Sequence, residues 1–210
     1  MITTKPLLRG HFHQALFFVF LGACFLLILK SHTRIQYVST IIYSLGALSM
    51  FGVSALYHRI HWSTSARLMM KRLDHSVIYI MIAGTFTPIC LLGLQGESGR
   101  NLLIGVWVFA ILGILQSLFF VNIPKMLSAV LYIFVGFLIL PYLSDLIPSL
   151  GMTNIFLLVF GGVAYTAGAI CYGLKYPVLK PAVFGYHEVF HLLVGVGAIL
   201  HFIVVYHLVN

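Results

Sequence analysis

The chain consists of long apolar runs separated by short polar or basic stretches. An α-helix needs about 20 residues to cross the hydrocarbon core of a bilayer, and the length of each run is close to this value. No fixed repeat or low-complexity linker divides it, so the pattern predicts an all-α membrane protein with one domain over residues 1–210. We expect a bundle of seven transmembrane helices. The expected spans cover about residues 12–29, 35–57, 76–94, 102–121, 126–143, 155–174 and 187–209.

Composition agrees with this class. Hydrophobic residues make up 61% of the chain and charged residues only 8%, whereas a soluble domain carries about 25% charged residues. A nucleic-acid-binding protein would need a soluble basic face, which this pattern does not provide. The formal charge of +8 is therefore expected to come from basic loops of a membrane protein. The three cysteines lie far apart within apolar runs, which indicates small core residues.

The basic residues also predict an orientation. With an odd number of spans the two tails lie on opposite sides, and the side that carries more Lys and Arg faces the cytoplasm. One side carries only Lys30, Arg34 and Arg100. The other carries nine basic residues: Lys5, Arg9, Arg59, Arg67, Lys71, Arg72, Lys125, Lys175 and Lys180. We therefore expect a cytoplasmic N-terminus and an external C-terminus.

The last apolar run opens with the motif H-E-x-x-H, formed by His187, Glu188 and His191. Histidines four residues apart project from nearly one face of a helix, and an imidazole pair of this kind binds zinc well. The same motif occurs in zinc proteases, where the glutamate is the general base. In this chain Glu188 is turned about 100° from His187, where it is also well placed to stabilise the helix N-terminus. The simplest alternative is two histidines at a membrane interface.

The predicted topology brings further polar residues to the same cytoplasmic face. The second span ends near His58, with Ser54 one turn deeper, and the third begins near Asp74. Three imidazoles from His58, His187 and His191 would leave one position of a Zn²⁺ site open, as in catalytic zinc sites. Asp74 is then the candidate general base, and Ser54 a candidate hydrogen-bond donor.

Each of these residues also has a structural interpretation. Asp74 could cap the third helix, Ser54 could bond to its own helix, and His58 could anchor a helix end in the interface. Polar groups at membrane depth are costly and usually functional, which favours a site for the set as a whole. His201 is expected to pack in the core, and His61 and His75 to flank the site. The interfacial histidines are expected to be His11, His13, His32 and His207.

Three motifs resemble one family. Ser54-Ala-Leu-Tyr-His58, Leu73-Asp-His-Ser-Val-Ile-Tyr-Ile-Met-Ile-Ala-Gly-Thr-Phe-Thr-Pro88 and Gly185-Tyr-His-Glu-Val-Phe-His191 are similar to the hemolysin III family, as is Lys5-Pro-Leu-Leu-Arg-Gly-His11. That family is the bacterial branch of the progestin and adipoQ receptors, which include the adiponectin receptors and are distantly similar to alkaline ceramidases. The resemblance implies a seven-helix fold in a bacterial inner (plasma) membrane. It also implies Zn²⁺ on His58, His187 and His191, with the family's Ser and Asp positions at Ser54 and Asp74.

Three function classes follow. The first is a zinc-dependent hydrolase of a membrane lipid amide, working at the cytoplasmic leaflet. The second is a regulator of lipid homeostasis in which zinc is structural and a lipid is the ligand. The third is the pore-forming cytolysin that the family name implies, although such a hydrophobic chain is poorly suited to secretion in soluble form. In each class the partner is a lipid or the bilayer, and nucleic acid is not expected.

Overall fold

The computed structural model describes residues 6–94, 96–180 and 182–209, and Lys5 of the N-terminal motif lies outside them. The regular elements of the described residues are helices, as the fold class predicted. They include seven α-helices, a π-helical turn at Ile89–Gly93 and a 3₁₀ turn at Leu140–Tyr142. The α-helices are α1 (His11–Leu29), α2 (Arg34–Arg59), α3 (Thr64–Pro88), α4 (Gly96–Phe119), α5 (Lys125–Phe137), α6 (Leu143–Leu174) and α7 (Tyr186–Leu208).

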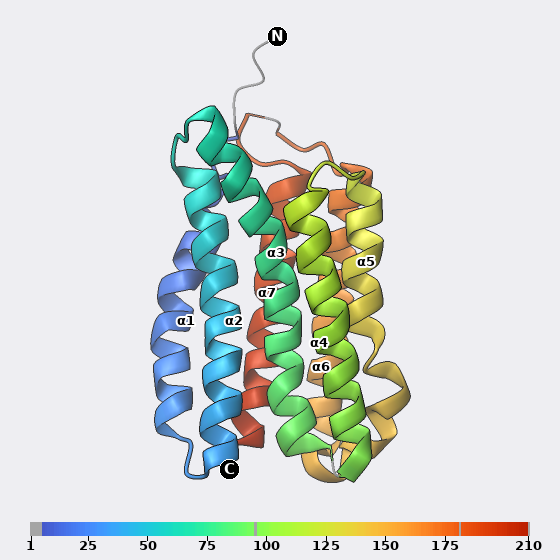
Figure 1. Ribbon diagram of the computed structural model, residues 1–210. Coiled ribbons are helices and arrows are strands. Elements are labelled where there is room, and N and C mark those ends of the chain that lie inside the picture. Colours follow the sequence, from blue (N-terminus) through green and yellow to red (C-terminus); the bar gives the residue numbers. More distant parts are fainter. Residues whose placement is uncertain (1–5, 95, 181, 210) are drawn as a thin grey trace.

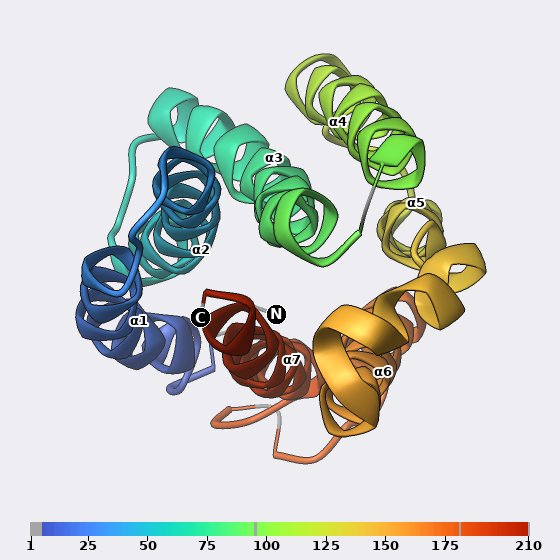
Figure 2. The same cartoon turned by 90° about the horizontal axis from the view of Figure 1, so that it is seen from below.

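Neighbouring helices run in opposite directions along one bundle axis (Figure 1). The C-terminal end of α2 and the N-terminal ends of α3 and α7 therefore lie at the same end of the molecule (Figure 1). Seen along the axis, α7 lies between α1 and α6 and faces α3 across the centre of the bundle (Figure 2). This arrangement lets the first turns of α7 meet the last turn of α2.

The prediction of seven spans was wrong in one respect: six helical segments of the described residues, not seven, are long and apolar enough to cross a membrane. The two spans expected at about 126–143 and 155–174 fall in one such segment, Lys125–Leu174. Within it α5 has only 13 residues, or about 20 Å of helix against a hydrocarbon core of about 30 Å. Helical structure resumes directly after the 3₁₀ turn at Leu140–Tyr142, so no loop separates α5 from α6.

Two element boundaries also differ from the expected ones. Helix α3 begins at Thr64, so the basic stretch expected as a loop forms its first turns, where long Lys and Arg side chains can reach the aqueous interface. The polar break expected near residues 148–153 is a kink at Gly151 inside α6. Gly151 has a φ of 70°, a conformation that glycine adopts without steric cost.

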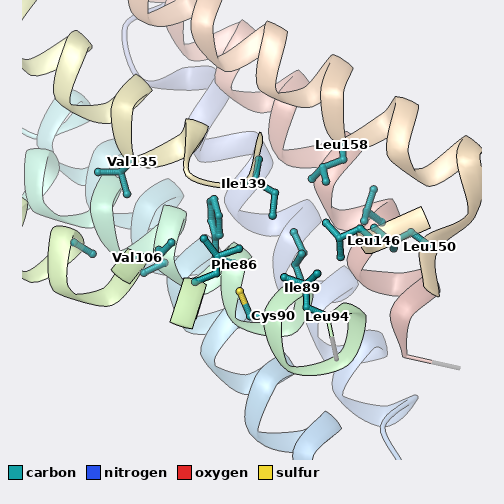
Figure 3. Packing of buried hydrophobic residues seen from close by; sticks show 14 of the residues in the cluster. Phe86, Ile89, Cys90, Leu94, Val106, Val135, Ile139, Leu146, Leu150 and Leu158 are labelled. Atoms are coloured by element: carbon teal, nitrogen blue, oxygen red, sulfur yellow. The ribbon is translucent and has the colours of Figure 1, made fainter. Parts of the chain in front are cut away.

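The interior holds two clusters of buried apolar side chains. One lies among α3, α4, α5 and α6 and includes Phe86, Ile89 and Leu158 (Figure 3). The other lies among α1, α2, α3 and α7 and includes Phe20 and Phe51. Large apolar side chains such as Phe18 are also exposed over the outer surface, as expected for helices that face lipid. The two clusters hold the helices that carry the polar residues described next.

Candidate metal site

Three histidines from two helices meet inside the bundle. His58 comes from the last turn of α2, and His187 and His191 come from successive turns of α7. One ring nitrogen of each lies within 4.8 Å of the others, and all three side chains are buried. The spacing of four residues places both α7 rings on the side of the helix that faces α2. The structure thus brings together residues that are about 130 positions apart in the chain.

The donor set fits a metal ion. The Nε2 atoms of His58 and His187 are 3.2 Å apart, and two nitrogens bound at about 2.0–2.1 Å to one tetrahedral zinc would be about 3.3 Å apart. In addition, the Nδ1 atom of His191 is buried without a hydrogen-bond partner among the described residues. Buried polar atoms are normally paired, so an unpaired imidazole nitrogen in this cluster is consistent with a ligand. Three neutral imidazoles favour zinc or a similar borderline metal.

Asp74 lies beside the histidines, in the third turn of α3. Its Oδ2 atom is 3.8 Å from Nε2 of His58 and 4.0 Å from Nδ1 of His75. The hydroxyl of Ser54 forms a hydrogen bond with the Asp74 side chain. Because α3 begins ten residues earlier, at Thr64, Asp74 does not cap this helix, which removes the structural alternative considered for it. The alternative considered for Ser54 was a bond to its own helix, but its hydroxyl is bonded to Asp74.

The site opens into a long, mostly apolar cavity between the helices. Its lining includes Ser54, Asp74, His187 and His191 at one end and apolar side chains such as Ile89, directly after the end of α3. The empty space is about 1280 Å³, counting the part open to the surroundings. From Asp74 to Ile89 the helix rises about 22 Å, so the cavity has the length and the apolar lining to receive a hydrocarbon chain.

Glu188 does not face the histidines. One of its carboxylate oxygens is bonded to the Nε atom of Arg9, and the other accepts a hydrogen bond of 2.8 Å from the backbone N–H of Gly185. The side chain is fully buried. This is a helix-capping interaction combined with a buried ion pair, so the glutamate of H-E-x-x-H links the start of α7 to the segment before α1.

The segment before α1 closes this end of the bundle. The backbone N–H groups of Leu7 and Leu8 donate to the carbonyls of Ala182 and Val183, at 2.9 and 3.2 Å. Gly10 follows with a φ of 84°, and a Cβ atom placed on it would lie 2.7 Å from Cβ of His58. A glycine is therefore required here for two reasons, the positive φ and the close approach to a candidate ligand. Arg9 binds Glu188 and Gly10 packs against His58, so this N-terminal motif lies next to the candidate metal site.

Sequence reasoning missed one residue, His13, which it placed in the membrane interface. His13 is only 2% exposed and its ring stacks on that of His191. On α1 it shares a face with Phe20, Cys24 and Leu27, which are all buried. This shared face was the signal available in the sequence. It is difficult to recognise because the other faces of α1, which contact lipid, are equally apolar.

The other histidines lie outside the cluster. His201 is bonded to its neighbours, with Nε2 3.0 Å from the carbonyl oxygen of Leu158. His75 lies beside Asp74 but also bonds to the carbonyl of Lys71 at 2.8 Å. His61 is exposed, and so are His32 and His207, whereas His11 is half-buried and contacts Arg59.

Comparison with known proteins gives consistent results. The sequence model of the family described as "Haemolysin-III related" matches residues 1–202. The chain is 34% identical to Hemolysin-3 of Bacillus cereus over 179 residues, which are 85% of this chain and 78% of that protein. It is 35% identical to the Hemolysin-3 homolog of Bacillus subtilis (strain 168) over 175 residues, 82% of this chain and 78% of the other.

A more distant similarity reaches animal proteins. The chain is 24% identical to the monocyte to macrophage differentiation factor of Homo sapiens over 165 residues, 77% of this chain and 66% of that one. These matches agree with the resemblance drawn from the three sequence motifs, including its extension to the progestin and adipoQ receptor superfamily.

Proposed function

The chain belongs to the haemolysin-III related family, and on this premise we propose that it is a zinc-dependent hydrolase of a membrane lipid amide. One observation carries the proposal: three buried histidines and a carboxylate meet, and two of these histidines and the carboxylate line one end of a long, mostly apolar cavity. A cavity of this shape suits a lipid whose hydrocarbon chain lies along α3 while its polar linkage lies beside Asp74. The distant similarity of the superfamily to alkaline ceramidases favours an amide over other linkages.

In this proposal His58, His187 and His191 hold the ion. Bound zinc would supply a Lewis acid that acidifies water and polarises a carbonyl group. Asp74 is then the general base, which takes a proton from water at Oδ2 and returns it to the leaving amine. The Ser54 hydroxyl, which is bonded to Asp74, holds the carboxylate in one orientation. The buried position of these groups would limit access of bulk water to the reacting atoms.

The basic residues support a location at the cytoplasmic leaflet of the bacterial inner (plasma) membrane. Eight of the described Lys and Arg residues belong to the end of the bundle that carries the histidines, and three to the other. By the positive-inside rule this end faces the cytoplasm. The N-terminus is then cytoplasmic and the end of α7 external.

The test is hydrolysis by detergent-purified protein supplied with a long-chain lipid amide, with release of fatty acid as the signal. We expect turnover that stops with a zinc chelator and returns when zinc is added. Asp74→Asn removes the base but keeps the side-chain shape, so it should lower turnover about 10²–10⁴-fold while about one zinc per chain remains bound.

The outcomes separate the function classes. Full turnover in Asp74→Asn would exclude Asp74 as the base. Bound zinc without turnover on any lipid amide or ester would instead favour the regulator with structural zinc. Conductance of the wild-type protein in pure lipid bilayers, without hydrolysis, would favour the pore-forming cytolysin.

A further inference from the structure

One histidine of α1 lies against the candidate metal site without being one of its three members. The rings of His13 and His191 are stacked, with centroids 3.8 Å apart and planes only 10° from parallel. Phe51 contacts His13 in a T-shaped arrangement, with centroids 5.3 Å apart and planes at 78°. One face of the His191 ring is therefore covered by a flat ring that is itself held in place.

His191 lacks the support that metal-binding histidines usually have. Such a ligand normally donates its second ring N–H to a carboxylate or a carbonyl, which fixes the plane of the ring. Within the described part of the chain, neither ring nitrogen of His191 is hydrogen-bonded to a carboxylate or a carbonyl, so whichever nitrogen binds the metal, the other lacks such a partner. The plane of the His191 ring is thus set by packing.

We propose that His13 is a positioning residue of the metal site, and that the flat face of its ring fixes the ring plane of His191. A turn of the His191 ring out of this plane would drive its edge into His13, which is in van der Waals contact. The polar contact of His13 with this part of α7 is to the backbone of His191, and between the two side chains the contact is ring face to ring face. The proposal rests on the metal-binding part of the proposed function and does not depend on hydrolysis.

Two substitutions test whether the ring plane matters. His13→Phe keeps a flat ring of similar size, and His13→Leu keeps most of the volume without the plane. Zinc affinity of the full-length, detergent-purified protein is measured by competition with a chelator. We expect His13→Phe to stay within about threefold of wild type and His13→Leu to bind about tenfold more weakly, as for other residues that orient a ligand. The visible absorption of bound Co²⁺ should be unchanged in His13→Phe and altered in His13→Leu.

Phe20→Leu is the matched control. Phe20 lies seven residues further along the same buried face of α1 and also packs on Phe51, with centroids 4.8 Å apart. The same loss of an aromatic ring there should lower thermal stability about as much as His13→Leu and leave zinc affinity unchanged. This comparison separates a specific effect on His191 from a general loosening of α1.

The proposal is overturned if His13→Phe and His13→Leu both bind zinc like wild type, because the ring plane is then irrelevant. It is also overturned if both weaken binding equally, which would assign the role to a ring nitrogen, or if Phe20→Leu weakens binding as much as His13→Leu. Failure of the wild-type protein to bind zinc would overturn the metal-dependent function itself, so the two failures are distinguishable.

Discussion

Helix α7 carries histidines in two places along the same cavity, and their surroundings differ. Near its start, His187 and His191 face His58 from α2, with ring nitrogens of all three within 4.8 Å. Further along, His201 also lines the cavity, but it bonds to a backbone carbonyl and packs on Tyr165, with ring centroids 5.2 Å apart. In the first set, Nδ1 of His191 has no hydrogen-bond partner among the described residues, whereas Nε2 of His201 is bonded to the carbonyl of Leu158.

This difference shows what makes a candidate metal site. A histidine on the inner face of a membrane helix is stabilised by pairing its nitrogens, because an unpaired polar group is costly there. A backbone carbonyl pairs with a nitrogen of His201, and this histidine then has a packing role. At the start of α7, the end of α2 brings a third imidazole close enough for all three to share one ion. The spacing of His187 and His191 along α7 makes a site possible, but the third histidine, from α2, decides that the site can form.

The largest effect should come from removing the residue that distinguishes the two places. His58→Ala deletes one of three ligands, and we expect zinc affinity to fall by at least about 100-fold. His201→Ala, the control on the same helix, should keep wild-type zinc content and lose only stability. Metal analysis of the purified proteins measures both. Equal zinc in wild type and His58→Ala would rule out a site shared by α2 and α7.

A smaller effect is expected from the glycines that lie against each set. Gly10→Ala places a side chain on a residue with positive φ and brings its Cβ atom within 2.7 Å of Cβ of His58. His58 must then move, and zinc affinity should fall about tenfold. Gly161→Ala is the counterpart, because its Cβ atom would lie 2.3 Å from Cδ2 of His201. It should reduce thermal stability and leave zinc affinity unchanged. A chelator-competition assay in which both variants bind zinc like wild type would contradict the first expectation.

The smallest effect on the site should come from Glu188, despite its place in H-E-x-x-H. Glu188→Gln loses the ion pair with Arg9, so we expect unfolding to become easier by about 1–3 kcal/mol while zinc affinity stays unchanged. Thermal unfolding in detergent measures this. Arg9→Gln should cost a similar amount, and the double variant little more than either alone. Loss of hydrolysis with normal stability in Glu188→Gln would instead support the protease-like role.

The candidate site was partly visible in the sequence because polar residues stand out against apolar helices. His58, Asp74, His187 and His191 each interrupt such a run near one end, and the topology placed those ends together. Other features left no such mark. The start of α3 was masked by its basic first turns, which resemble a loop in composition but are helical. The shortness of α5 was hidden because the flanking residues are as apolar as the helix itself.

The sequence by itself therefore determined an all-helical membrane protein, the family to which it belongs, and the polar residues that gather at one end of it. Only the tertiary structure decided that Glu188 binds Arg9 and Gly185, that His201 bonds to a carbonyl, and that His13 stacks on His191. The physical reason is that all faces of a membrane helix are apolar, since some contact lipid and others contact protein. Hydrophobicity thus predicts where a helix lies in the chain, and the contacts between helices decide which side chains meet.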